Sequence, residues 1–276
     1  MSKKIISRKI NSFEKDFMTF NQKIRKLSPL VLCLTNFVTV TDCANGLLAI
    51  GASPVMSLDP SDAKELASIA SAVVLNIGTL TSVTLEGMIA AGREAERRKI
   101  PIIFDPVGVG ATPTREKAAD LILRTLHPTV IRGNASEILK IAGVFTDETQ
   151  KGVDSSANFG SEPILDSILS LSERLKTIVA VSGEEDFLCS GNDILKVSGG
   201  TSLLTKITGT GCLLSSLLAA YVAANPEDPL NATLMGHALM KNAGENAFKK
   251  LKNPLALGKF KTYLFDELSI LTSKPS

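Results

Sequence analysis

The sequence predicts an α/β fold in which a doubly wound, mostly parallel central sheet carries helices on both faces. Short apolar runs rich in β-branched residues alternate along the chain with longer helical stretches. Near-continuous apolar character is typical of parallel strands that are buried on both faces, and the alternation is typical of βαβ units. We expect strands at Leu30–Leu34, Ala72–Asn76, Pro101–Asp105, Thr129–Arg132 and Thr177–Ser182.

Helix signals lie between these runs. A helical stretch after the first strand ends near Gly51, a second has its start signal at Ser61–Glu65, and a third runs from Thr81 to Lys99. The turn Ser190–Asp193, set between two apolar runs, predicts a hairpin at the sheet edge over Phe187–Val197. After this hairpin the chain is mostly helical.

Length and composition favour one globular domain over residues 1–276, with residues 1–12 as a solvated, flexible tail. A polar stretch, Phe145–Pro163, predicts an excursion from the core. Lys and Arg number 30 against 28 Asp and Glu, and Trp is absent, which argues against a nucleic-acid partner. No apolar run has the length of a membrane span or signal peptide. The four cysteines form no C-x-x-C pair, so we expect reduced thiols and a cytoplasmic location.

Polar or small residues follow each predicted strand. Because ligands of open parallel sheets bind beyond the carboxyl ends of the strands, these residues predict a site at one edge of the sheet. The segments are Thr35-Asn36, Asn76–Thr79, Asp105–Gly110, Arg132–Glu137 and Ser182–Glu184. Asn36 either lines this pocket or serves a turn.

The most distinctive motif is Thr208-Gly-Thr-Gly-Cys212, which opens into an apolar helical run. A turn with Gly209 and Gly211 at the start of a helix presents backbone N–H groups at the positive helix end, which suits phosphate oxygens. The alternative is a glycine turn that only permits close packing. A P-loop is excluded elsewhere, because Ala52 follows the Gly46–Gly51 spacing where a lysine is required.

Three charged residues near the predicted edge each have two interpretations. Asp105 is either a Mg²⁺ ligand or a turn aspartate before proline. Glu137 is either part of the metal site or the partner of Asn134 in a capping box. Arg132, at the end of a buried strand, either binds phosphate or pairs with Glu137.

Five motifs, in this order and spacing, resemble those of hydroxyethylthiazole kinases, over a length from about Ser28 to near the C-terminus. They are Ala44–Met56, Leu75-Asn-Ile-Gly-Thr79, Asp105-Pro-Val-Gly-Val-Gly-Ala-Thr112, Ile131-Arg-Gly-Asn-Ala-Ser-Glu137 and Thr205-Lys-Ile-Thr-Gly-Thr-Gly-Cys212. The resemblance implies a ribokinase-like fold, homotrimers with sites between subunits, and ATP-dependent phosphorylation of 4-methyl-5-(2-hydroxyethyl)thiazole in thiamine salvage.

The resemblance also implies roles for individual positions. The thiazole is contacted by Met56 and Gly209, and the Mg²⁺–phosphate region contains Asp105 and Glu137. From its place after the first strand, and not from the resemblance, we also expect Asn36 on the substrate side of the site. ATP is contacted by Arg132, Ser182 and Thr208. Cys212 stands where the wider superfamily has an aspartate base, and we expect its thiol to orient the substrate hydroxyl without being essential. A small residue that packs the helix start is the alternative for Cys212.

The sequence departs from the family pattern in places, and other functions remain open. Gly199–Ser202 occupies a segment in which histidine and proline are frequent, and Thr39–Cys43 is more polar than usual. Rival functions are a kinase for a pyrimidine or pyridoxal alcohol, a nucleotide-driven dehydratase of hydrated nicotinamide nucleotides, and a non-catalytic nucleotide-binding protein. His127 and His237 are predicted to be structural.

Overall fold

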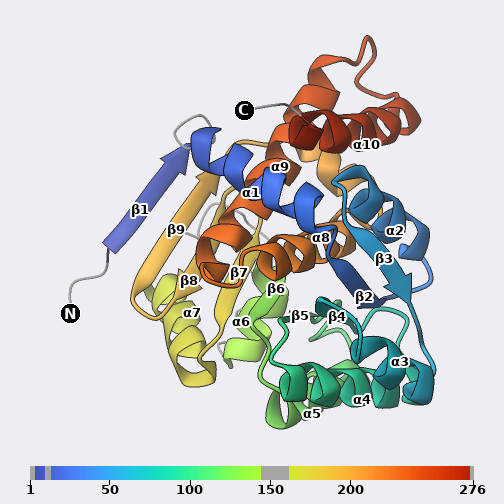
Figure 1. Ribbon diagram of the computed structural model, residues 1–276. Coiled ribbons are helices and arrows are strands. Elements are labelled where there is room, and N and C mark those ends of the chain that lie inside the picture. The colour runs from blue at the N-terminus through green and yellow to red at the C-terminus, as the bar shows by residue number, and fades with distance from the viewer. Residues whose placement is uncertain (1–3, 10–13, 144–161, 274–276) are drawn as a thin grey trace.

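The computed structural model describes residues 4–9, 14–143 and 162–273. In these residues nine strands form one sheet with the order β1-β9-β8-β7-β6-β5-β4-β2-β3 (Figure 1). Neighbouring strands are parallel except where β8 is involved, because β8 runs antiparallel to both β7 and β9. The strands are β1 Lys4–Lys9, β2 Leu30–Leu34, β3 Ser53–Met56, β4 Ala72–Asn76, β5 Ile102–Asp105, β6 Val130–Asn134, β7 Ile178–Ser182, β8 Asp186–Ser190 and β9 Asp193–Ser198.

Helices cover both faces of the sheet, and each layer has its own apolar core (Figure 1). One layer contains α1 Glu14–Leu27, α2 Val40–Ala49, α8 Thr210–Ala224, α9 Pro229–Lys249 and α10 Leu257–Ser273. The other contains α3 Pro60–Ala67, α4 Ser82–Arg98, α5 Pro113–Thr125, α6 Ala135–Ala142 and α7 Glu162–Leu175.

The two cores share the strands because successive side chains of a strand point to opposite faces. In β2, Val31 and Cys33 belong to the core under α8, whereas Leu32 and Leu34 belong to the core under α4. All four side chains are fully buried. A strand that packs against helices on both faces must be apolar at every position, which explains the continuous apolar runs in the sequence.

The predicted doubly wound sheet and its five strands are confirmed, two of them with the predicted bounds. The helix predicted from Thr81 to Lys99 is α4, with Thr81 as its N-cap in a capping box with Thr84. The start signal of α3 was misplaced. Asp59 caps that helix by accepting hydrogen bonds from the backbone N–H groups of Ser61 and Asp62, at 2.9 and 3.2 Å.

Three predictions about the sheet edges require correction or extension. Residues Lys4–Lys9 form β1 and pair in parallel with β9, so the predicted tail of residues 1–12 is wrong for this segment. The hairpin around Ser190–Asp193 is confirmed, but it lies inside the sheet because β1 covers β9. The edge strand β3 was not predicted.

Of the polar stretch Phe145–Pro163, residues up to 161 lie outside the described part of the chain, and Pro163 belongs to α7.

Among the helices of the described residues, none combines the length and the apolar character needed to cross a membrane.

Candidate active site

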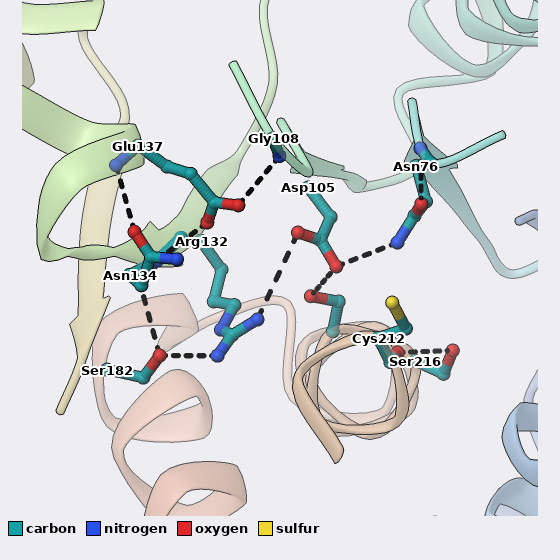
Figure 2. A network of polar contacts seen from close by, with 12 residues as sticks. Asn76, Asp105, Gly108, Arg132, Asn134, Glu137, Ser182, Cys212 and Ser216 are labelled. Atoms are coloured by element: carbon teal, nitrogen blue, oxygen red, sulfur yellow. Dashed lines mark hydrogen bonds and ion pairs between the residues drawn. The ribbon is translucent and has the colours of Figure 1, made fainter. Parts of the chain in front are cut away.

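The carboxyl ends of β4 to β7 and the first turn of α8 bring polar side chains together (Figure 2). The register of the sheet sets Asn76 of β4 beside Asp105 of β5, and Asn134 of β6 beside Ser182 of β7. Helix α8 packs against β2, β4 and β5 on one face of the sheet. The polar residues therefore meet at the carboxyl ends of the strands, where the sequence predicts a site.

Asp105 is completely buried at the end of β5. Its Oδ2 atom accepts hydrogen bonds from Asn76 Nδ2 at 2.9 Å and from Ser215 Oγ at 2.8 Å. Its Oδ1 atom has no hydrogen-bond partner among the described residues, and Arg132 Nη1 lies 3.9 Å from it. Burial raises the pKa of Asp105 to about 6, although the charge of Arg132 acts in the opposite direction. This carboxyl group therefore holds an unsatisfied oxygen toward the site.

Arg132 lies between Asp105 and Ser182 (Figure 2). Its Nη2 atom donates a hydrogen bond to Ser182 Oγ, and its Nε atom has no partner among the described residues. The ion pair of this arginine is with Asp105 rather than with Glu137. A buried guanidinium with unused N–H groups is suited to bind a phosphate.

Glu137 forms the predicted capping box at the start of α6. Asn134 Oδ1 accepts from the Glu137 N–H at 2.9 Å, and Glu137 Oε2 accepts from the Asn134 N–H at 2.9 Å. The other carboxylate oxygen, Oε1, accepts from the Gly108 N–H at 2.8 Å. Glu137 is therefore a cap that also fixes the loop following Asp105, and each of its oxygens keeps a further lone pair for a ligand.

Helix α8 begins at Thr210, with Gly209 as its N-cap and, among the described residues, no side-chain cap. Gly209 has a φ of 88°, in the left-handed region that favours glycine. A Cβ atom on Gly211 would lie 2.6 Å from Arg132 Nη1, so the arginine lies against the backbone of this turn. The N–H groups of the first turn and the Arg132 guanidinium thus converge on one point, which is suited to an anion.

Cys212 is largely buried in the first turn of α8. Its Sγ atom accepts a hydrogen bond from Asn36 Nδ2 at 3.2 Å. Burial and the nearby charge of Asp105 raise the pKa of the Cys212 thiol, opposite to the expected effect of a helix N-terminus. The thiol is therefore neutral near pH 7 and does not act as a strong base.

Asn36 is buried, and its amide joins three side chains. Besides the bond to Cys212, Nδ2 donates to Asn76 Oδ1 at 3.2 Å, and Oδ1 accepts from Thr39 Oγ1 at 3.1 Å. Both amide hydrogens are used within the protein, so the contacts of Asn36 position Cys212 and Asn76.

A cavity of about 890 Å³ opens beside Arg132, and Cys212 is not among its lining residues. Its lining includes Ser182, Thr210 and Gly211. The predicted Thr208 is exposed on the preceding turn and is not among the lining residues. Met56 ends the edge strand β3, half-buried and in register with Cys33.

Two residues of the site were not predicted individually, Asn76 and Ser215. Both donate to Asp105 Oδ2 and hold it in place. Asn76 was visible as a polar residue that ends an apolar strand. Ser215 was visible as a hydroxyl within an apolar helix, three residues after Cys212 and so on the same face.

The donor set decides what kind of metal the site can hold. Within the described residues there is no group of three or more His, Cys, Asp or Glu side chains that could hold a metal ion by itself. Asp105 Oδ1 is nevertheless a buried carboxylate oxygen that has no hydrogen-bond partner in the described part of the chain. Mg²⁺ characteristically binds one or two carboxylates together with water and substrate phosphates, so the residues fit such an ion when a nucleotide is bound.

Comparison with known proteins gives a consistent result. The family model of the hydroxyethylthiazole kinase family matches residues 21–274. Hydroxyethylthiazole kinases of Alkaliphilus metalliredigens and Alkaliphilus oremlandii are 42% and 43% identical, and the matches cover 92% of this chain in each case and 91% and 92% of those proteins.

Solved structures agree with the sequence relatives. The hydroxyethylthiazole kinase protein of Pyrococcus horikoshii OT3 has a TM-score of 0.81 and 34% identity, with 93% of each chain covered. A ribokinase-like superfamily protein of Enterococcus faecalis V583, at 12% identity, has a TM-score of 0.65 over 96% of each chain and shares the fold. The fold is therefore ribokinase-like, and this chain belongs to the hydroxyethylthiazole kinase family.

Proposed function

We propose that this protein transfers the γ-phosphoryl group of ATP to the primary alcohol of 4-methyl-5-(2-hydroxyethyl)thiazole, in thiamine salvage. The observation that carries the proposal is the convergence of the α8 N-terminus, Arg132 and Asp105 at one point. Phosphoryl transfer depends mainly on positioning and on stabilising charge at the transferred group, and these groups can supply both. Family membership supports the choice of acceptor.

The nucleotide is proposed to occupy the large cavity, with its phosphates at Arg132. The unused N–H groups of Arg132 would bind phosphate oxygens, and the hydrogen bond to Ser182 holds the guanidinium in place. Thr208 is proposed to approach ATP from the turn before Gly209. The first-turn N–H groups of α8 would stabilise charge on the transferred group.

Mg²⁺ is proposed as the metal that accompanies ATP. Asp105 would hold it through Oδ1, directly or through water, and Glu137 would contribute through water while it continues to cap α6. The chemistry supplied by this ion is neutralisation of negative charge on the phosphate oxygens.

The thiazole is proposed to lie beside Cys212, with Met56, Gly209 and Asn36 around it. Because the thiol is neutral, it can orient the hydroxyl of the substrate through a hydrogen bond, and Asn36 fixes the position of the sulfur. In this arrangement the substrate hydroxyl would face the phosphates held at Arg132.

A homotrimer with sites between subunits is proposed for the assembly. The side chains of Phe37 and Val38, which directly follow Asn36, are 75% and 53% exposed. Large apolar side chains at the rim of a site are typical of a surface that another chain covers. The four cysteines are free and buried, which suits the reducing environment of the cytoplasm.

The proposed function is tested by a product assay with mass spectrometry. Purified protein, MgATP and hydroxyethylthiazole are expected to give thiazole phosphate, and omission of Mg²⁺ is expected to abolish it. Hydroxymethylpyrimidine and pyridoxal serve as parallel acceptors. If folded, ATP-binding protein yields no thiazole phosphate, or prefers one of the other acceptors, the assignment is wrong.

A further inference from the structure

The ammonium group of Lys241 is surrounded by oxygen atoms. Lys241 belongs to α9, and its side chain is only 6% exposed. Nζ donates to the backbone carbonyl oxygens of Glu184 at 3.0 Å, Gly199 at 3.1 Å and Gly183 at 3.3 Å. The carboxylate oxygen Asp186 Oδ1 lies 3.2 Å from the same nitrogen. Three carbonyl oxygens and one carboxylate oxygen around a single positive charge form the kind of donor set that binds an alkali cation.

These oxygens come from two loops that border the large cavity. Gly183 and Glu184 follow β7, whereas Gly199 follows β9, and all three line the cavity together with Lys241. The first loop directly continues from Ser182, which accepts the hydrogen bond of Arg132. Lys241 therefore connects both loops to α9. Through the loop after β7 it is also linked to Ser182, and so to Arg132, the proposed phosphate-binding residue.

The four oxygen atoms around Lys241 Nζ form a cage, and its carboxylate, that of Asp186, is itself held by two hydrogen bonds. Asp186 Oδ2 accepts from His237 Nδ1 at 2.8 Å, and Oδ1 accepts from the Gly183 N–H at 2.9 Å. Burial raises the pKa of Asp186, but the hydrogen bond and charge of His237 and the charge of Lys241 outweigh it and lower this pKa. Asp186 is therefore an anion that balances the buried ammonium.

The second loop has an independent anchor on α9. Glu245, four residues after Lys241 and so on the same side of the helix, accepts the Gly200 N–H at 2.8 Å. A Cβ atom on Gly200 would lie 3.3 Å from Lys241 Cγ, so the lysine stem packs closely against this loop. The Gly199–Ser202 segment, which departs from the family pattern, is thus shaped around Lys241.

We propose that the ammonium group of Lys241 serves as a built-in monovalent cation, which fixes the two cavity loops in the conformation that receives ATP. Lys241 is a positioning residue, because it acts through the loops. The inference rests on the proposed function in placing ATP in this cavity. It follows that the protein needs no potassium, and that potassium or a small alkylammonium ion can take the place of the ammonium once the side chain is removed.

The test uses Lys241→Ala, with Lys249→Ala as a matched control. Lys249 lies on the same helix but is exposed and does not line the cavity. We expect the Kd for MgATP, measured by calorimetry, to rise on the order of tenfold in Lys241→Ala, the effect of one charged hydrogen-bonding group. Propylammonium chloride or potassium chloride should restore the affinity, whereas tetramethylammonium chloride at equal ionic strength, whose cation cannot donate and is too large, should not.

Two results with the variant would overturn the proposal. One is that Lys241→Ala binds MgATP as Lys249→Ala does. The other is that affinity is lost and neither potassium nor propylammonium restores it. If the alanine variant unfolds, Lys241→Met gives the test with potassium alone, because its side chain occupies the space that propylammonium would need. A wild-type protein whose activity requires potassium in place of tetramethylammonium would also contradict the proposal.

The two proposals fail in different ways. If wild-type protein binds MgATP but phosphorylates no thiazole, the acceptor assignment fails and the calorimetric test of Lys241 still decides the further inference. If wild-type protein does not bind MgATP, the proposed function fails, and recovery of the Lys241→Ala melting temperature by potassium then decides whether the cage takes a cation.

Discussion

Asp105 combines complete burial with one oxygen that accepts no hydrogen bond from the described residues. Asp105→Asn should lower kcat/KM by roughly two to four orders of magnitude, because charge stabilisation by a metal ion is worth several kcal/mol. In the wild-type protein, kcat/KM should fall as the pH drops through about 6, since protonation removes the metal-binding charge. Steady-state kinetics between pH 5 and 8 test both statements. A flat profile would show that Asp105 need not be ionised.

The same substitution should stabilise the protein at neutral pH. Burial raises the pKa of Asp105 from 3.8 to about 6, so the folded state binds more protons than the unfolded state between these values. The stability present below about pH 4 is lost as the pH rises through 6. Replacing the carboxylate with a neutral amide removes this loss, by roughly 1–3 kcal/mol at pH 7. Denaturant unfolding at pH 7 and pH 4 measures the difference, which should shrink at pH 4.

Cys212 differs from Asp105 because its thiol is neutral. Cys212→Ser should lower kcat by less than about tenfold, whereas loss of a general base typically costs 10²- to 10⁴-fold. Cys189→Ser, at a buried cysteine of β8 outside this site, controls for a hydroxyl in place of a thiol. A Cys212→Ser protein that folds and binds ATP but has no turnover would assign the thiol an essential role.

At the level of elements, the first turn of α8 fixes the position of a side chain from β6, because Arg132 lies against Gly211. Gly211→Ala would place a methyl group 2.6 Å from the present position of Arg132 Nη1 and displace the guanidinium. We expect the KM for ATP to rise about 10- to 100-fold, the effect of losing charged hydrogen bonds to phosphate.

Gly258→Ala in α10 is the matched control for Gly211→Ala, since within the described residues no atom beyond its chain neighbours and its own helix backbone lies within 4 Å of the added methyl group. The control should leave KM unchanged. An unchanged KM in Gly211→Ala as well would mean that Arg132 is not held at this turn.

Elements of this sheet could be predicted where burial on both faces makes a strand apolar throughout, as in β2 and β4. The edge strands lack this signal. β1 is half charged, with three charged residues among six, and β3 has four residues including a proline. The capping box of Glu137 was predictable because it is local. The contacts of Asn76 and Ser215 with Asp105 were not, because they depend on strand register and on which face α8 presents to the sheet.

At the level of the whole molecule, the proposed trimer makes a prediction about Phe37. Phe37→Glu places a charge on a side chain that is 75% exposed in the single chain, and it should reduce the mass measured by light scattering from three chains toward one. Ile69→Glu is the matched control, because Ile69 is 64% exposed but precedes β4. It therefore lies at the amino ends of the strands, whereas Phe37 lies at their carboxyl ends. Equal masses for the two variants would contradict the proposed interface.

The reversed direction of β8 has a consequence for how the family can vary. Because β8 runs back between β7 and β9, the loops after β7 and β9 open at the same edge although they lie close together in the sequence. Much of the wall of the cavity is thus encoded by the single segment 182–202. Recombination between relatives could exchange that segment in one piece, provided that Lys241 and Glu245 on α9 are already matched to it, and alter nucleotide preference while leaving the acceptor end of the site untouched.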